Sequence, residues 1–246
     1  MSFQGKTALI TGGASGMGLL CGQCLAREGA NVALLDVNRE GLDAAARGIC
    51  QSGGDAIGLL TDIRVYAQVE QAVSKTVEAF GSVDILINCA GGASRRVLKR
   101  SESFENMPVE VLDWGIDVNL KGPLYCARAV FGQMMGQGGG VIVNLGSISG
   151  EEGSFSSPDY SAAKSGMNGL TKSLAQGGAK YNIRSVCVSP GPVLTRPGMA
   201  KMTTLLGRAA DPQEIVDFIL YLVSDKAAFV TGSSFLIDGG RHCMGH

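Results

Sequence analysis

The chain has 246 residues, of which 45% are hydrophobic and 17% are charged. This composition excludes a disordered chain, and the length suits one sizeable core, as in many single-domain α/β proteins. The 21 Lys and Arg residues nearly balance the 22 Asp and Glu residues, so the overall charge predicts no attraction to nucleic acid or to a membrane surface. We therefore expect one globular domain over residues 1–246, to which any charged partner must be attracted by local charges.

The cysteines are odd in number and scattered through apparent core segments, which predicts buried free thiols in a reducing cytoplasm. They are Cys21, Cys24, Cys50, Cys89, Cys126, Cys187 and Cys243. The C-x-x-C pair at Cys21 and Cys24 has no second pair to complete a zinc site, so we expect no metal there. No leader sequence begins the chain, and no apolar run reaches the roughly 20 residues of a membrane span. These features predict a cytoplasmic protein.

Short apolar runs alternate with amphipathic helical stretches along the chain. The runs are residues 6–10, 31–35, 55–60, 83–87, 141–145, 183–188 and 234–237. Residues 39–52 and 65–80 carry apolar side chains at helical spacing, as crossover helices do. This alternation predicts an α/β fold of the Rossmann-like, doubly wound type, in which a seven-stranded parallel sheet is flanked by helices on both faces. Two irregular regions, residues 92–108 and 189–211, follow strands at the edge where such folds bind ligands.

A glycine-rich turn joins the first predicted strand to a helix-like sequence. It reads Thr11-Gly12-Gly13-Ala14-Ser15-Gly16-Met17-Gly18. Glycines allow a sharp turn and a close approach of backbone N–H groups to a pyrophosphate, which the helix N-terminus also attracts. Close packing of a helix on a strand is the structural alternative, but the strand-turn-helix setting favours nucleotide binding.

Asp36 closes the second predicted strand, 18 residues after Gly18. A carboxylate at this place accepts hydrogen bonds from the adenosine ribose hydroxyls and repels a 2′-phosphate. Ser15 and Val37 are uncharged where an NADP enzyme often supplies Arg or Lys. The pattern predicts NAD rather than NADP, and the alternative is a turn aspartate at a strand end.

Tyr160 is the one tyrosine of five that is followed four residues later by a lysine, Lys164, in sequence suited to a helix. Residues i and i+4 share one face of a helix. A phenol alone is a poor base at neutral pH, but an adjacent ammonium stabilises the phenolate. Tyr160 is thus a candidate general acid or base. The alternative is an ordinary surface pair on a helix.

In combination, these features resemble the short-chain dehydrogenase/reductase family over nearly the whole chain. The glycine-rich turn matches its nucleotide motif, and Asp62-Ile63 resembles the pair that holds the adenine. Asn88-Cys89-Ala90-Gly91 resembles its Asn-Asn-Ala-Gly element, with Cys89 in place of the second Asn. Asn119 lies in the matching Val-Asn position, Ser147 lies 13 residues before Tyr160, and Pro190-Gly191-Pro192-Val193-x-Thr195 resembles the nicotinamide-side loop.

The resemblance implies a role for each matching residue. Tyr160 would protonate the carbonyl oxygen as hydride reaches the carbon, and Ser147 would hydrogen-bond the same oxygen. Lys164 would lower the tyrosine pKa and hold the nicotinamide ribose, while Asn119 would hold a proton-relaying water. A capping serine and a helix-interior asparagine are the structural alternatives. The implied cofactor contacts are Gly12, Ser15, Gly16, Met17, Gly18, Asp36, Val37, Asp62, Ile63, Asn88, Ala90, Gly91, Tyr160, Lys164, Pro190, Val193 and Thr195.

The substrate is less defined by the sequence. Residues 94–100 carry four positive charges near the expected pocket mouth, which suits an anionic substrate or, equally, a solvated loop whose charges pair with Glu102 and Glu105. Glu151 and Glu152 either reach substrate hydroxyls or lie in solvent. The ten residues between Thr195 and Leu206 form a short lid that contains Arg196.

Several functions remain open at this point. We expect an NAD-dependent oxidoreductase of a secondary alcohol or ketone, with a polyol, sugar, sugar acid or hydroxy acid as substrate. A 3-oxoacyl thioester reductase and a hydroxysteroid dehydrogenase are the alternative enzymes. A non-catalytic dinucleotide sensor is an alternative of a different class, although it has no need of Asn119, Ser147, Tyr160 and Lys164 together.

The resemblance also implies a homotetramer. The helices expected at residues 121–136 and 158–181 resemble those that pack between subunits, and Ile237-Asp238-Gly239-Gly240 resembles an interface strand and turn. Residues 241–246 form a tail that reaches a neighbouring active site or frays. Its His242, Cys243 and His246 suggest a metal site only weakly, and the tyrosine chemistry requires no metal.

Overall fold

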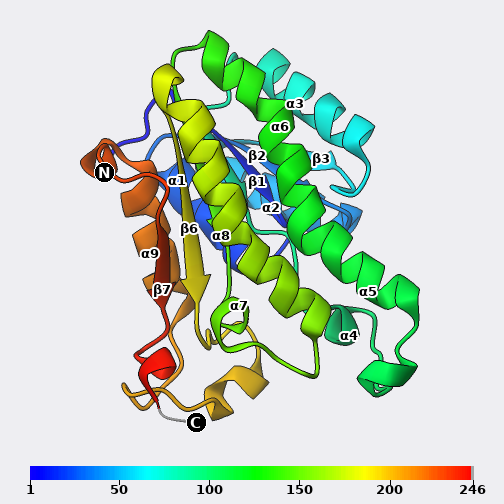
Figure 1. The fold of residues 1–246 in the computed structure, drawn as a ribbon. Helices are drawn as coiled ribbons and strands as arrows, with labels where there is room; N and C mark the ends of the chain where they lie inside the picture. The colour runs from blue at the N-terminus through cyan, green and yellow to red at the C-terminus, as the bar shows by residue number, and fades with distance from the viewer. Residues whose placement is uncertain (245–246) are drawn as a thin grey trace.

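A seven-stranded parallel sheet forms the centre of the protein, in the order β3-β2-β1-β4-β5-β6-β7 (Figure 1). It is seen in a computed structural model that describes residues 1–244. The strands are β1 (Thr7–Thr11), β2 (Asn31–Asp36), β3 (Asp55–Leu60), β4 (Ile85–Asn88), β5 (Gly140–Leu145), β6 (Ile183–Pro190) and β7 (Ser234–Ile237). Each strand lies where an apolar run predicts one, and β6 extends two residues further.

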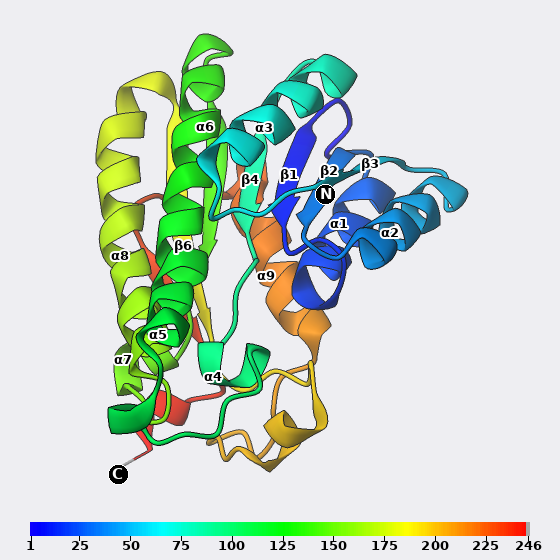
Figure 2. The ribbon, with the colours of Figure 1, turned by 90° about the vertical axis from the view of Figure 1, so that its right-hand side faces the viewer.

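Helices cover both faces of the sheet, as the doubly wound prediction requires. Among the described residues they are α1 (Gly16–Arg27), α2 (Arg39–Gln51), α3 (Tyr66–Phe80), α4 (Ser94–Val97), α5 (Val109–Ile116), α6 (Gly122–Gly136), α7 (Ser149–Glu152), α8 (Pro158–Gly178) and α9 (Pro212–Val223). Figure 2 shows α3, α6 and α8 on one side of the strands and α1, α2 and α9 on the other.

Alternation of side chains along each strand explains this two-sided arrangement. In β1, Ala8 and Ile10 pack into the core beneath α1, α2 and α9, whereas Leu9 packs into the core beneath α3 and α6. Because both faces are covered, the whole of β1 is buried. The predicted fold class is therefore confirmed.

The strand order reverses between β1 and β4, and parallel strands leave an open crevice outside their carboxyl ends at such a point. The two regions expected to be irregular both lie at this edge (Figure 2). Residues 92–108 contain α4 and a 3-10 turn, η1 (Phe104–Asn106). Residues 189–211 contain another, η4 (Pro197–Lys201). These two loops therefore border the crevice.

A π-helical turn, η2 (Asp117–Lys121), joins α5 to α6 in place of a plain helix start at residue 121. Such turns add a residue to a helix and commonly occur at functional sites. Asn119 is the buried residue of this turn. Among residues 1–244, no helix combines the length and apolarity needed to cross a membrane.

Candidate active site

A cleft of about 630 Å³ opens at the carboxyl ends of β1, β2 and β4. Most of the predicted cofactor residues line it. These are Gly12, Ser15, Gly16, Met17, Gly18, Asp36, Val37, Asp62, Ile63, Ala90, Gly91 and Thr195. Residues far apart in the sequence thus meet in one place, as the strand-end arrangement predicts.

Glycine is required at Gly18 and at Gly16 of the β1–α1 turn for two different structural reasons. A Cβ on Gly18 would lie 2.3 Å from the Gly12 carbonyl oxygen, so only glycine lets α1 pack this closely on the turn. Gly16 has φ +57°, and open space surrounds the place where its Cβ would be. Ser15 precedes α1 in an extended conformation and its side chain makes no capping bond, and the first residues of the helix line the cleft. Open space beside a helix N-terminus fits a diphosphate.

Asp36 presents its carboxylate at the other side of this turn. Its Oδ2 accepts a hydrogen bond from Ala14 N at 3.1 Å, and its Oδ1 accepts one from Asn38 N at 3.0 Å. These bonds fix the carboxylate at the edge of the cleft, next to the exposed Val37. A fixed acceptor beyond a diphosphate site is suited to ribose hydroxyls.

The adenine-side pair is held by a residue that the sequence did not indicate. Arg64 Nε lies 2.9 Å from Asp62 Oδ1, and Arg64 Nη2 lies 2.6 Å from Asp62 Oδ2. Hydrogen bonds from this guanidinium lower the pKa of Asp62. Ile63 is buried beneath Asp62, where it packs against Gly122 at the start of α6. Arg64 also lines the cleft.

Five predicted cofactor residues do not line the cleft, namely Tyr160 and Lys164 of α8 and Asn88, Pro190 and Val193. Asn88 is buried, and its Nδ2 donates to Asn144 Oδ1 at 2.9 Å, which cross-links β4 to β5. The Pro190 carbonyl accepts a hydrogen bond from Ile148 N, and Val193 is buried. These three residues therefore support the segments around the cleft. They do not line it, so their predicted contact with the cofactor stays a prediction.

Tyr160 and Lys164 lie one turn apart near the start of α8. Lys164 Nζ lies 5.6 Å from the centre of the Tyr160 ring and donates a 2.6 Å hydrogen bond to the Leu145 carbonyl at the end of β5. Lys164 is only 5% exposed, so its charge is held in a fixed place by the sheet. An ammonium fixed beside a phenol is the arrangement that the tyrosine chemistry needs.

Asn119 holds the loop after β4 through its side-chain amide. Its Oδ1 accepts from Gly92 N at 2.9 Å, while its Nδ2 donates to the carbonyls of Gly92 at 3.0 Å and Gly115 at 2.8 Å. A Cβ on Gly91 would lie 2.4 Å from Asn119 Oδ1 and 3.6 Å from Lys164 Nζ. The backbone at Gly91 thus runs directly past both predicted catalytic side chains.

Ser147 lies in the turn between β5 and α7, where its Oγ accepts a 3.1 Å hydrogen bond from Ser149 N. The hydroxyl hydrogen has no acceptor among the described residues and remains available to a ligand. Ser147 therefore combines the local turn bond of the structural alternative with a free donor.

Comparison with known proteins identifies the family. The family model described as short chain dehydrogenase matches residues 6–205. The chain is 35% identical to the 3-oxoacyl-(acyl-carrier-protein) reductase FabG of Thermotoga maritima, over 98% of this chain and 99% of that protein. It is 31% identical to a 7α-hydroxysteroid dehydrogenase of Bacteroides fragilis, over 97% and 95%. A hydroxy(phenyl)methylsuccinyl-CoA dehydrogenase subunit of Thauera aromatica is 34% identical, over 98% of both chains.

The chain belongs to the short-chain dehydrogenase/reductase family. It is therefore an oxidoreductase that acts on CH–OH groups, and its cofactor is a nicotinamide dinucleotide. The expected resemblance is confirmed. The cleft fits such a cofactor, because the open space at Gly16 and the fixed carboxylate of Asp36 lie on one continuous surface.

The four basic residues within positions 94–100 of this short-chain dehydrogenase/reductase have different surroundings. Arg95 Nη2 donates to the Ser101 carbonyl at 2.7 Å, and Arg100 pairs with Glu102, so both charges hold the loop itself. Glu105 instead accepts from Ser103. Of the four basic side chains, Arg96 lines the cleft. The ion pairing expected of a solvated loop is present for Arg100 and Glu102 but not for Arg96 or Glu105, and the last two residues are both exposed.

Arg241 of the C-terminal tail joins Glu152 of α7 to the lid. Arg241 donates 3.2 Å hydrogen bonds to Glu152 Oε2 from both Nε and Nη2, and a 3.1 Å bond to the Thr203 carbonyl in the lid. Glu151 accepts instead from Asn168 Nδ2 at 3.1 Å on the surface. Glu152 is thus a structural ion-pair partner rather than a free carboxylate for substrate.

The tail is folded up to residue 243, which corrects the interpretation of a frayed end. Residues Arg241–Cys243 form a 3-10 turn, η6, and His242 Nδ1 lies 2.7 Å from the buried carboxylate of Asp238. Burial raises the pKa of Asp238, but hydrogen bonds from His242 and Gly240 outweigh it and lower the pKa overall. No metal-binding cluster occurs within residues 1–244, and His246 lies outside the described residues.

The cysteines are all free, as predicted, but their burial is mixed. Cys21, Cys24, Cys126 and Cys187 are buried, whereas Cys50 and Cys243 are exposed and Cys89 lines the cleft. The expectation that they all lie in the core is wrong for Cys50, Cys89 and Cys243. Cys50 lies in the last turn of α2, Cys89 directly follows β4, and Cys243 ends η6, so all three lie at the ends of elements rather than in their buried middles.

Proposed function

We propose that this enzyme uses NAD to interconvert a secondary alcohol and its ketone, with Tyr160 as general acid and base. The observation that carries the proposal is the Tyr160–Lys164 pair. Lys164 is buried, donates a hydrogen bond to the Leu145 carbonyl, and lies close to Gly91 of the cleft. The proposal treats residues 1–246 as one NAD-binding domain.

Each side chain has a separate task in the reduction direction. The nicotinamide supplies the hydride. The Tyr160 hydroxyl donates its proton to the carbonyl oxygen of the substrate, and the free hydroxyl hydrogen of Ser147 donates a hydrogen bond to the same oxygen. Lys164 stabilises the phenolate that remains and holds the nicotinamide ribose. Asn119 keeps the Gly92 backbone in place and serves the proton relay from Lys164 to solvent. Oxidation reverses these steps.

Asp36 supports NAD over NADP. Its carboxylate lies fixed at the far side of the diphosphate site, where ribose hydroxyls donate to it and a 2′-phosphate would meet a like charge. Met17, Asp62 and Thr195 complete the cofactor surface along the cleft.

The substrate class is a polyol, a sugar, or a sugar acid or hydroxy acid. Reduction of a 3-oxoacyl thioester is the second candidate, because one relative is named as such a reductase. Its weakness is the carboxylate of Asp36, since biosynthetic reductases of that type usually use NADPH.

The assembly proposed is a homotetramer in the cytoplasm. Leu124 on α6 is 47% exposed, and β7 forms the open edge of the sheet, so apolar and hydrogen-bonding surface is available to a second copy. The free cysteines are consistent with a reducing compartment. Light scattering after gel filtration measures the oligomeric state directly.

Absorbance of the reduced nicotinamide provides the test of function. The panel contains polyols, sugar acids, hydroxy acids, steroids and 3-hydroxyacyl thioesters, each with NAD and with NADP. Turnover of a hydroxy compound with NAD supports the proposal, and preferred turnover of thioesters with NADP supports the second candidate. Cofactor binding with no turnover of any compound would favour a dinucleotide sensor.

A further inference from the structure

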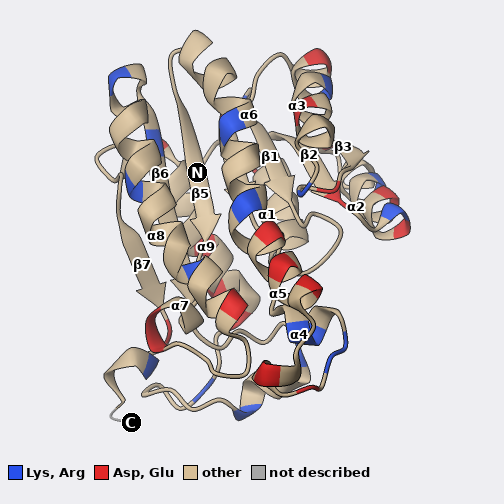
Figure 3. Cartoon of the chain, turned by 45° about the vertical axis from the view of Figure 1, so that its right-hand side comes forward, with Lys and Arg blue, Asp and Glu red and all other residues tan. Residues whose placement is uncertain are grey.

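Two arginines from separate loops line the same cleft and lie within electrostatic range of each other. Arg96 belongs to α4 after β4, and Arg196 immediately precedes η4 in the lid after β6. Both line the same cleft as Gly91 and Trp114. Figure 3 shows basic positions on α4 and on the segments below it, at the end of the molecule where the two loops lie.

Arg96 lies against the loop that Asn119 holds. A Cβ on Gly92 would lie 2.4 Å from Arg96 Nη2, so the guanidinium lies directly against the Gly92 backbone. That backbone is in turn bound at both its N–H and its carbonyl by Asn119. The loop that places Gly91 beside Lys164 therefore also places the charge of Arg96.

Neither guanidinium is neutralised by the protein. Among residues 1–244, no ion pair involves Arg96 or Arg196, whereas Arg64, the third arginine of the cleft, is bound to Asp62. Desolvation lowers the pKa of Arg96, the nearby charge of Arg196 lowers it further, and attraction to Tyr160 opposes both. The two cations thus repel each other within electrostatic range of the predicted catalytic tyrosine.

We propose that Arg96 and Arg196 together bind the carboxylate of an anionic substrate whose hydroxyl or keto group lies at Tyr160. A carboxylate between two guanidiniums relieves their repulsion and accepts charge-assisted, forked hydrogen bonds. The inference rests on the proposed function and narrows its substrate class to hydroxy acids and their oxo acids. Neutral polyols and steroids lack the group that this site binds.

The diphosphate of the cofactor has the same anionic chemistry and is the other possible source of the ligand. The structure favours the substrate, because Arg96 lies against Gly92, close to Asn119, whereas the helix N-terminus at Ser15 and Gly16 already provides a site for phosphates. The test must therefore measure cofactor binding and carboxylate binding separately.

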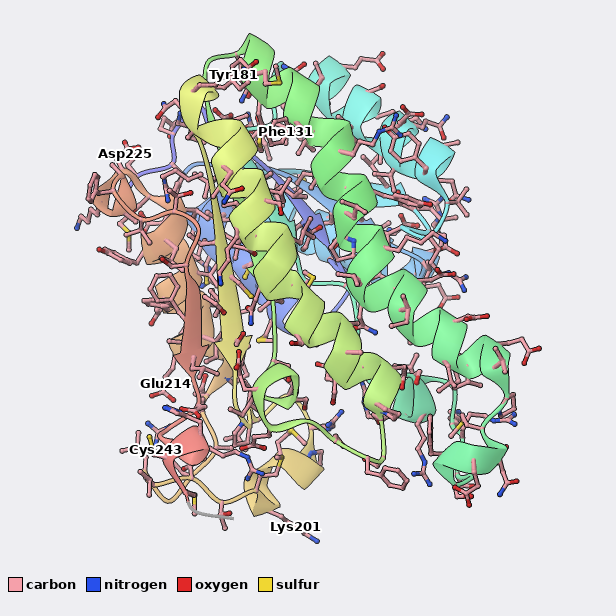
Figure 4. The ribbon with its side chains drawn as sticks, viewed as in Figure 1. Phe131, Tyr181, Lys201, Glu214, Asp225 and Cys243 are labelled. Atoms are coloured by element: carbon pink, nitrogen blue, oxygen red, sulfur yellow. The ribbon has the colours of Figure 1, made fainter. Side chains whose placement is uncertain are left out.

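Binding of an unreactive carboxylate tests the site without any need for turnover. The fluorescence of NADH bound to the wild-type enzyme is followed during titration with acetate, butyrate and hexanoate, and with the matched neutral amides. The variants are Arg96→Gln and Arg196→Gln. Lys99→Gln in the same loop and Lys201→Gln in the lid are the charge-matched controls, since neither lysine lines the cleft. Figure 4 shows Lys201 pointing away from the body of the protein.

The proposal predicts that at least one carboxylate binds the enzyme–NADH complex more tightly than its amide. Each arginine variant should weaken that carboxylate by about tenfold or more, while the amides, the NADH affinity and both lysine controls remain within about twofold of wild type. On a reacting substrate, the same variants should lower kcat/KM for a hydroxy acid but not for its methyl ester.

Two results would overturn the proposal. One is equal binding of carboxylates and amides to the wild-type complex. The other is a loss of NADH affinity in Arg96→Gln and Arg196→Gln as large as the loss of carboxylate affinity, which would assign both arginines to the cofactor diphosphate. Carboxylate binding that depends on both arginines, without turnover of any alcohol, would support the anion site and contradict the proposed function.

Discussion

The nucleotide side and the substrate side of the cleft are built in different ways. On the nucleotide side, the glycine turn packs mainly through its backbone. Gly18 lies against the Gly12 carbonyl, Gly13 N donates to the Leu35 carbonyl at 3.0 Å, and Ala14 N donates to the Asp36 carboxylate at 3.1 Å. On the substrate side, the loops are joined by side chains from distant parts of the chain. Arg241 binds Glu152 and Thr203, and Asn119 binds Gly92. The first side is a local consequence of a motif, and the second is a product of the tertiary structure.

This difference indicates where the enzyme can vary. A backbone cradle tolerates few substitutions because glycine is required where a Cβ would collide, as at Gly18. Side-chain links such as Arg241–Glu152 can be exchanged without change to the sheet. Relatives named as a reductase and as a steroid dehydrogenase can therefore share one fold while the side-chain links on the substrate side differ.

The largest expected effect is a loss of kcat on replacement of Tyr160, which we place between the nucleotide side and the substrate side. Replacement of Tyr160 by Phe removes the proton donor, so we expect kcat to fall by about 10²- to 10⁴-fold while NADH affinity stays the same. Steady-state rates and NADH fluorescence measure the two quantities. Tyr181→Phe is the matched control, because Tyr181 lies beyond the opposite end of α8 (Figure 4). Wild-type turnover by the Tyr160 variant would contradict the assigned role.

The next largest effect concerns cofactor choice on the nucleotide side. Asp36→Asn removes the negative charge and keeps the shape, so the Kd for NADH should rise about tenfold and the Kd for NADPH should fall. Fluorescence titration with NADH and NADPH measures both. Asp43→Asn on α2, which removes a charge away from the cleft, should change neither constant. An unchanged ratio of the two affinities in Asp36→Asn would show that this carboxylate does not select the cofactor.

A smaller effect is expected from the link between the tail and α7. Glu152→Gln weakens the bonds from Arg241 and should lower the free energy of unfolding by about 1–3 kcal/mol, because the pair is mostly buried. Denaturant unfolding measures the loss. The adjacent Glu151→Gln should have little effect, since Glu151 is exposed and its side chain makes one exposed hydrogen bond, to Asn168, among the described residues. Equal losses in the two variants would mean that the tail does not stabilise this side.

The smallest effect is expected at the far anchor of the lid, where Arg208 binds exposed Glu214 of α9 (Figure 4). Hydrogen bonds from Arg208 and from Asp211 N lower the pKa of Glu214 to about 2. Its contribution to stability is therefore present above the usual pKa of 4.5 and is lost as the pH falls toward about 2. Glu214→Gln should flatten the dependence of Tm on pH in that window, and 0.5 M salt should reduce the wild-type slope. An acid limb of equal slope in the variant would exclude this pair as its source.

The sequence by itself determined the sheet, the nucleotide turn and the Tyr160–Lys164 pair. Apolar runs of strand length, glycines after the first run and helical spacing are local patterns, so they can be identified without knowledge of the fold. The same holds for Asp36, whose place at a strand end fixes its position in the cleft. Asn88, Pro190 and Val193 show the limit of this reasoning, because the sequence places them at or just after a strand end but does not show whether a side chain turns toward the cleft or the core.

Only the tertiary structure decided which charges act and which merely hold loops. Arg95 and Arg96 are adjacent and identical in type, yet one binds its own loop and the other faces the cleft. The pairing of Arg241 with Glu152 and the presence of Arg96 and Arg196 in one cleft likewise have no local signal in the sequence. A long flexible side chain takes its direction from the partners that packing brings within reach, and those partners come from segments as much as 89 residues away.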